Sequence, residues 1–212
     1  MTTSTLKLLA LFFMILDHIG YFFPQYDAIR VLGRMSAPIF FFCFVEGYNH
    51  THDREKYKQR LAYFSVLMCI INFQMIYLFK FIGHPLPSSI NILVPNVIFT
   101  LFVMFLILEG VDNQQYYKLL AIIFIPFTEY SYYAFYSVLI FRYVKDKRLK
   151  MYLFCIVNFI ICLLTKNTFE IPMIFSSLLL WFYNGKNGKF NTKLFYILYP
   201  LNFYFIKLIS IL

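Results

Sequence analysis

Charged residues are scarce in this sequence, and their scarcity is its most informative feature. Asp, Glu, Lys and Arg make up only 14% of the 212 residues, whereas 61% are hydrophobic and the mean hydropathy is +0.68. Soluble domains are about 25% charged and about 45–50% apolar, so this composition excludes an ordinary soluble fold. The length suffices for about seven to nine spans of roughly 20 residues each. We therefore expect one all-α, polytopic membrane domain that covers residues 1–212.

Acidic residues are the rarer of the two charge signs. The chain has 10 Asp and Glu against 19 Lys and Arg, a formal net charge of +9. The positive charge lies in short loops between apolar runs, which is typical of the cytoplasmic side of a membrane protein. This distribution disfavours a nucleic-acid partner and favours the lipid bilayer, with anionic lipid or a phosphate-bearing ligand as further partners of the basic loops.

Cysteine and histidine are too few and too scattered to predict a metal centre. All four cysteines fall within apolar runs and share no metal-like spacing, which is typical of small buried hydrophobic side chains. His50 and His52 resemble a ligand pair only faintly, because no further ligand accompanies them. We expect no metal.

The apolar runs predict eight or nine transmembrane segments. The first run has no small-residue cleavage site and is followed by further spans, so we expect it to be retained and not removed as a signal peptide. The predicted spans are Leu6–Phe23, Ala37–Tyr48, Leu61–Ile82, Ile92–Leu108, Leu119–Tyr143, Met151–Leu164, Ile171–Tyr183 and Leu194–Leu212.

The fifth of these runs is interrupted by polar residues and a proline. Pro126, Thr128 and Glu129 lie near its centre, so it is either one kinked span or a broken, re-entrant pair of short segments. The pair explains the polar centre better, because irregular backbone is tolerated in a membrane where it is buried in protein. It also places the basic loops at 49–60, 142–150 and 184–193 on one side. The protein is then predicted to lie in the cell membrane with a cytoplasmic N-terminus and an outer C-terminus.

Four polar residues stand out in the first two apolar runs, two of them deep in the first run and two that bracket the second. They are Asp17, His18, Arg34 and Glu46, and such residues are costly in a bilayer and usually paired and functional. Neighbouring helical residues point about 100° apart and do not face each other. We therefore expect Asp17 to pair with Arg34 and to hold the two helices together. His18 is then left facing a cavity, where it can act as a general base.

The sequence is also compatible with other hypotheses about the roles of these residues. Glu46 either binds a cation or a substrate amine, or extends to the inner interface. Asp17, His18 and Glu46 also suit a small proton- or ion-coupled transporter, and a membrane-embedded partner of a secretion machine needs no site at all. The cations of the segment 54–60 are most simply topology determinants, and a phosphate site is a further alternative.

Several short motifs then line up in order along nearly the whole chain. They are LDHIG at 16–20, GR at 33–34, PIFFFCFVEGY at 38–48, Lys56-Tyr57, Arg60-Leu61, PNVIFTL at 95–101, YNGKNG at 183–188 and FYILYPLN at 195–202. In these stretches the chain resembles the TraX family, the membrane proteins that include the F-pilin acetylase. It is also similar to the wider transmembrane acetyltransferases.

The resemblance implies an acyltransferase that moves acetyl from cytosolic acetyl-CoA to an amine or hydroxyl of an exported or membrane-associated acceptor. That acceptor is a protein N-terminus, a peptide or a sugar. His18 becomes the general base or acyl carrier, and Asp17 becomes its electrostatic partner. The basic inner loops would hold the CoA phosphates. Further cofactor- or substrate-binding candidates on family motif positions are Arg34, Glu46, Tyr57, Arg60, Asn96 and Asn184.

One position departs from the family pattern. Members of the family often carry a histidine after the Tyr-Pro pair, whereas Asn202 stands near that place here. Asn can replace a hydrogen bond but cannot take up a proton at neutral pH, so a chemical role for that histidine would be lost in this chain.

Overall fold

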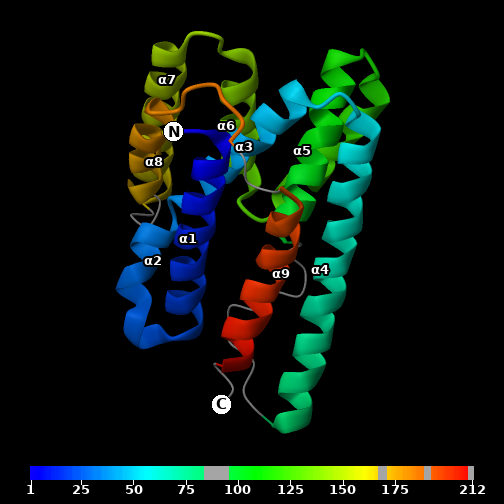
Figure 1. The fold of residues 1–212 in the computed structure, drawn as a ribbon, viewed down its shortest axis with the longest axis vertical. Helices are drawn as coiled ribbons and strands as arrows, with labels where there is room; N and C mark the ends of the chain where they lie inside the picture. Colours follow the sequence, from blue (N-terminus) through cyan, green and yellow to red (C-terminus); the bar gives the residue numbers. More distant parts are fainter. Residues whose placement is uncertain (84–95, 167–170, 189–191, 210–212) are drawn as a thin grey trace. The chain divides into compact units, whose positions relative to one another are not determined.

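The computed structural model describes residues 1–83, 96–166, 171–188 and 192–209, and all regular structure in these ranges is helical (Figure 1). The all-α prediction is confirmed. The helices are α1 (Thr3–Phe22), η1 (Pro24–Tyr26), α2 (Asp27–Gly33), α3 (Ser36–His50), α4 (Arg54–Ile82), α5 (Val97–Asp112), η2 (Tyr116–Phe127), α6 (Ser131–Tyr143), α7 (Lys147–Thr165), α8 (Ile171–Trp181) and α9 (Thr192–Ile209), where η marks a 3-10 helix.

The predicted count of eight or nine spans is not confirmed. In the described ranges four helical segments are long and apolar enough to cross a bilayer: Thr3–Phe22, Asp27–His50, Arg54–Leu78 and Lys147–Thr165. Three shorter apolar helices accompany them. These helices indicate a membrane protein, whereas the side on which each end lies stays a prediction.

Two segments that we predicted as polar connections are helical. The stretch between the first two spans forms η1 and α2, and the basic segment 54–60 belongs to the first turns of α4. Asp53 explains the second case, because its carboxylate accepts a hydrogen bond from the Lys56 N–H at 2.9 Å and so caps α4. Charged side chains are compatible with a helix end that projects beyond the hydrocarbon region.

The predicted break in the fifth run is confirmed. Helix η2 ends at Phe127 and α6 begins at Ser131, with positive φ angles of 62° at Tyr130 and 38° at Ser131. The Thr100 hydroxyl on α5 donates to the Glu129 carbonyl at 2.9 Å, so a neighbouring helix satisfies backbone that the break leaves without a helical partner. A re-entrant path for this pair stays a prediction.

The chain divides into two compact units. Unit 1 comprises residues 1–45 and 139–210, and unit 2 comprises residues 46–138, so the boundaries fall inside α3 and α6. The prediction of a single domain stays a prediction.

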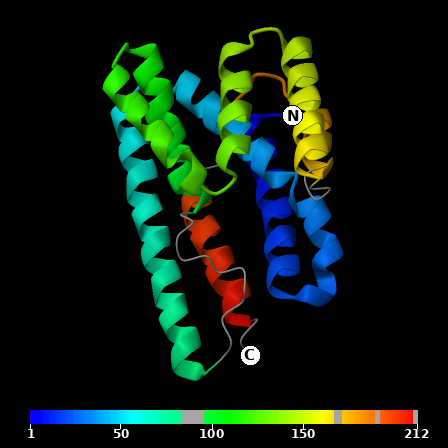
Figure 2. The ribbon, with the colours of Figure 1, turned by 180° about the vertical axis from the view of Figure 1, so that it is seen from behind.

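Unit 1 is built around the apolar faces of α1, α7 and α8. Leu6, Ala10 and Met14 recur every fourth residue and are all buried, which is the spacing of one helix face. Phe154 on α7 stacks on Phe141 with ring centroids 5.1 Å apart. Helix α1 also contacts α2 and α9, and Figure 1 and Figure 2 both show α1 and α2 as a tight hairpin.

Unit 2 is built around α5, which is apolar on every side and buried over ten of its residues. Helices α4 and η2 pack against it, as Figure 2 shows for α4 and α5. A helix that is apolar all round requires partners on more than one face. The core of unit 2 is therefore organised by α5.

Candidate functional site

The α1–α2 hairpin of unit 1 carries the polar cluster predicted from the sequence. Asp17 Oδ2 lies 3.7 Å from Arg34 Nη1, which confirms the predicted pair. Asp17 Oδ1 lies 3.9 Å from Arg30 Nε, and Arg30 also bonds Asp27 Oδ1 at 3.2 Å. Two arginines and two aspartates therefore balance each other's charge between α1 and the α2–α3 junction.

Two glycines allow the hairpin to close over this cluster. A Cβ atom on Gly33 would lie 2.5 Å from the backbone N and Cα of Asp17, so α2 and α1 meet there backbone to backbone. A Cβ atom on Gly20 would overlap the Arg30 side chain and lie 2.8 Å from the Tyr26 carbonyl oxygen. Close approach of this kind requires residues without a side chain.

Sequence reasoning missed Arg30 and the two glycines. Arg30 and Arg34 are four residues apart, the spacing at which helical side chains share a face, so their common partner could have been predicted. Gly33 stands directly before Arg34, within the GR motif. Its need to approach Asp17 follows only from the packing of α1 on α2.

His18 is half-buried on α1 directly after Asp17. Its ring lies within electrostatic reach of the Arg34 guanidinium, so Arg34 is common to the surroundings of both Asp17 and His18. Asp17 faces the two arginines, and its role as the electrostatic partner of His18 stays a prediction. The predicted cavity beside His18 stays a prediction.

Tyr57 and Glu46 belong to unit 2, near the α3–α4 junction. Tyr57 is buried, and a Cβ atom on Gly47 would lie 3.1 Å from its hydroxyl oxygen. The Tyr57 and Tyr48 rings both meet Phe105 of α5 edge-on, at centroid distances of 5.7 and 5.1 Å. The motif residues Gly47, Tyr48 and Tyr57 thus form one packed aromatic cluster.

The charged groups around this cluster are engaged with neighbours. The Arg60 guanidinium lies 5.6 Å from the centre of the Tyr57 ring and remains exposed. Glu46 Oε2 lies 3.8 Å from His50 Nδ1, whose other contact is the Glu46 carbonyl oxygen at 2.9 Å. Glu46 therefore lies near a histidine in the structure. The binding of a substrate amine by Glu46 stays a prediction.

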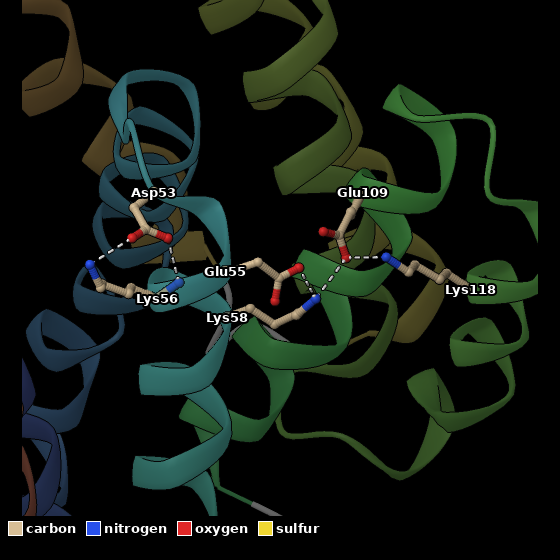
Figure 3. A network of polar contacts seen from close by, with 6 residues as sticks. All are labelled: Asp53, Glu55, Lys56, Lys58, Glu109 and Lys118. Carbon is tan, nitrogen blue, oxygen red and sulfur yellow. Dashed lines mark hydrogen bonds and ion pairs between the residues drawn. The ribbon is translucent and has the colours of Figure 1, made fainter.

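A buried carboxylate that sequence reasoning missed lies on α5, as Figure 3 shows. Glu109 is 4% exposed, and its Oε2 lies 2.6 Å from Lys118 Nζ and 3.6 Å from Lys58 Nζ. Lys58 also bonds Glu55 at 2.6 Å. These four residues tie α4, α5 and η2 together. The negative end of α5 adds to the attraction for both ammonium groups.

Asn96 makes two side-chain hydrogen bonds at the start of α5. Its side-chain oxygen accepts from the Phe99 N–H at 3.1 Å, and its Nδ2 donates to the Ser65 carbonyl at 3.1 Å. It therefore caps α5 and fastens it to α4. A cofactor- or substrate-binding role for Asn96 stays a prediction.

Asn184 lies in the exposed segment after α8. Its Oδ1 accepts from the Lys186 N–H at 3.1 Å, and its backbone N–H donates to the Met1 carbonyl at 3.0 Å. The YNGKNG segment is thus hydrogen-bonded to the residues that precede α1. Asn202 lies on α9, where its Nδ2 is buried and has no hydrogen-bond partner among the residues that the structure describes.

The eight predicted site residues divide between the units. Unit 1 holds Asp17, His18, Arg34 and Asn184, and unit 2 holds Glu46, Tyr57, Arg60 and Asn96. The first three lie together on the α1–α2 hairpin. Within the described ranges, no three or more His, Cys, Asp or Glu side chains lie together in a way that could hold a metal ion.

The fold and the cluster define a class of protein: an all-helical membrane protein with a paired carboxylate and a histidine in its first span. The sequence model of the TraX protein family matches residues 2–210, and the chain belongs to that family. No solved structure matches.

Two curated proteins are similar over a shorter stretch. The chain is 36% identical over 67 residues to the probable fimbrial assembly protein FimC, serogroup H1, of Dichelobacter nodosus, a stretch that is 29% of this chain and 28% of that protein. It is 39% identical over 66 residues to an uncharacterized protein of Rickettsia prowazekii (strain Madrid E), covering 31% of this chain and 25% of that protein. The matches span about a quarter of each relative.

Proposed function

We propose that this protein is an integral membrane acyltransferase that moves acetyl from acetyl-CoA to an amine or hydroxyl of an exported or membrane-associated acceptor. The observation that carries the proposal is His18, a histidine in a membrane helix beside a carboxylate bracketed by two arginines. Membership of the TraX family supports it. The fimbrial assembly name of one relative supports an exported protein as the acceptor class.

The residues of the hairpin take different parts in this reaction. As general base, the neutral His18 ring removes a proton from the acceptor while the acceptor nitrogen or oxygen attacks the thioester carbonyl carbon. The new C–N or C–O bond forms, the C–S bond breaks, and the departing CoA sulfur takes the proton from the imidazolium. As acyl carrier, the ring nitrogen first attacks the thioester carbonyl carbon, the C–S bond breaks, and CoA leaves as a thiol with the ring proton. The acceptor then attacks the acetyl carbon, the bond from that carbon to the ring nitrogen breaks, and the ring takes up the acceptor's proton.

The two arginines have a further use beside such a reaction. Negative charge develops on the thioester carbonyl oxygen during attack, and fixed cationic donors stabilise it. The guanidinium of Arg34 is paired with Asp17 and lies within electrostatic reach of the His18 ring. Asp17 holds it there, and so acts as a positioning residue in this scheme.

The first test is acetyl transfer by the purified full chain in nanodiscs. Wild type and His18→Ala are incubated with acetyl-CoA labelled in the acetyl group, and CoA release and label retained on the protein are measured. His52→Ala is the matched control, because His52 is an exposed histidine between α3 and α4. We expect turnover in wild type and His52→Ala and a loss of at least about 10²-fold in His18→Ala.

The label separates the two roles of His18. Label on the protein that is released by hydroxylamine and absent from His18→Ala indicates an acyl carrier, whereas turnover without retained label indicates a general base. Equal turnover in wild type and His18→Ala would contradict the proposal. Proton or ion flux without any CoA release would favour the transporter alternative instead.

A further inference from the structure

The cations at the polar ends of the helices differ in how they are neutralised. In the segment 54–60 of unit 2, both lysines are ion-paired with carboxylates, and both arginines lie over tyrosine rings. Five of its seven residues are charged, yet its cations are occupied by carboxylates and tyrosine rings of unit 2. It therefore offers little charge to an external ligand.

The α6–α7 connection of unit 1 differs in that its cations are not paired with carboxylates in the described part of the chain, although Lys147 also contacts a ring and a carbonyl group. Lys145, Lys147 and Arg148 are exposed, and no carboxylate among the described residues lies within 4.0 Å of their charged nitrogens. Asp146 stands between them, but its Oδ1 accepts the Leu149 N–H at 2.7 Å and caps α7. Lys147 and Arg148 also lie in the first turn of α7, where the helix dipole disfavours positive charge.

A tryptophan indicates the depth of this surface in the bilayer. Lys147 Nζ lies 5.7 Å from the centre of the Trp181 ring and donates to the Tyr183 carbonyl at 2.9 Å. Trp181 is the chain's single tryptophan and is 40% exposed. Tryptophan is enriched at the level of the lipid headgroups. Figure 1 shows the α6–α7 connection and the segment after α8 toward the same end of unit 1.

We propose that Lys145, Lys147 and Arg148 form a binding surface for anionic phospholipid headgroups. Lipid phosphates at this depth would supply negative charge to these cations, which have no carboxylate partner among the described residues. The guanidinium of Arg148 can bind a phosphate through two hydrogen bonds, and the lysines act as compact charges beside it. This surface is separate from His18 and does not depend on acyl transfer.

Trp181 provides a direct measurement of this binding. The full chain is placed in phosphatidylcholine bilayers that contain a small fraction of brominated phosphatidylglycerol or, separately, of brominated phosphatidylcholine. Bromine quenches the fluorescence of a tryptophan that it contacts. We expect the anionic lipid to quench Trp181 at a lower fraction than the zwitterionic lipid, and this preference to weaken as salt is added.

Charge variants connect the quenching to the surface. In Lys145→Gln/Arg148→Gln the preference for phosphatidylglycerol should fall about 30-fold, since each basic residue near the bilayer surface contributes about a fivefold effect. The charge-conserving Lys145→Arg/Arg148→Lys should keep it. Lys56→Gln is the matched control, because Lys56 is exposed but paired with Asp53 at 2.9 Å, and it should leave quenching unchanged.

Three results would overturn the proposal. They are equal quenching by the two lipids in wild type, an unchanged preference in Lys145→Gln/Arg148→Gln, and an equal loss in Lys56→Gln. Soluble CoA and inorganic phosphate are added in a separate arm. If either displaces the brominated lipid at micromolar concentration, the surface binds a soluble phosphate compound and the lipid assignment is wrong.

Discussion

Gly33→Ala tests whether the α1–α2 hairpin depends on backbone contact. The added Cβ would lie 2.5 Å from Asp17, about 1 Å short of an ordinary contact of 3.4 Å or more. Since the atoms that it meets are backbone atoms, α2 must move away from α1. The Asp17–Arg30 and Asp17–Arg34 separations of 3.9 and 3.7 Å then grow to about 5 Å.

The cost follows from three contributions. Overpacking of a close helix contact costs about 1–3 kcal/mol. Stretching each ion pair to about 5 Å costs about 1 kcal/mol at an effective dielectric of about 20. Alanine returns about 1 kcal/mol through its better helix propensity. We expect the free energy of unfolding to fall by about 2–4 kcal/mol.

Unfolding in mixed micelles titrated with SDS measures this change. Leu32→Ala is the matched control, because the neighbouring Leu32 side chain is 52% exposed, and it should cost less than about 1 kcal/mol. Asp17→Asn should also cost less in the Gly33→Ala background than in wild type, because the pairs are already stretched. A Gly33→Ala protein as stable as wild type would refute the backbone contact, and equal costs of Asp17→Asn in both backgrounds would refute its link to the ion pairs.

Three further predictions concern unit 2. Asn96→Ala should lower the free energy of unfolding by about 0.5–2 kcal/mol through loss of the α5 cap, whereas Asn96→Ser should keep part of it, and equal values for the two variants would contradict the capping role. Glu109→Gln should cost about 3–5 kcal/mol because it leaves buried lysine charge unpaired; Glu55→Gln, on the exposed side of Lys58, should cost about 0–1 kcal/mol in the same titration. The Lys56 amide and ammonium groups lower the pKa of Asp53 below 3.8, so Asp53 stabilises the fold above that pH and loses its contribution as the pH falls through its folded pKa. The difference in melting temperature between wild type and Asp53→Asn should accordingly be present at pH 7 and shrink below pH 3.8, and a difference independent of pH would contradict the assignment.

Local sequence features predicted the helical class and much of the hairpin. The apolar runs gave helices because few polar side chains interrupt them, and the break after η2 followed from the polar centre of the fifth run, with Thr128 and Glu129. The Asp17–Arg34 pair was predictable because two opposite charges near a bilayer have few other partners. The number of spans was not predictable, since several apolar runs are shorter as helices than a bilayer requires.

Contacts between residues far apart along the chain could not be predicted from the sequence. Asn96 is a binding candidate from its motif, and the sequence did not show that its bonds to Phe99 and Ser65 fasten α4 to α5. The basic segment 54–60 was a candidate for phosphate binding, yet partners within unit 2 occupy its cations. The number of charged residues can be read from a sequence, but their ion-pair and ring partners cannot.

By itself, the sequence determined that this chain is an all-helical membrane protein of the TraX family. It also determined that Asp17, His18 and Arg34 gather at its first two helices, because composition, hydrophobic runs and ordered motifs are local properties. Only the tertiary structure decided that Gly33 brings α2 onto Asp17, that Glu109 joins Lys58 to Lys118, and that no carboxylate among the described residues pairs with Lys145 or Arg148. Each of these depends on distances between atoms of different helices. The packing of the helices sets these distances, and a local sequence pattern does not reveal them.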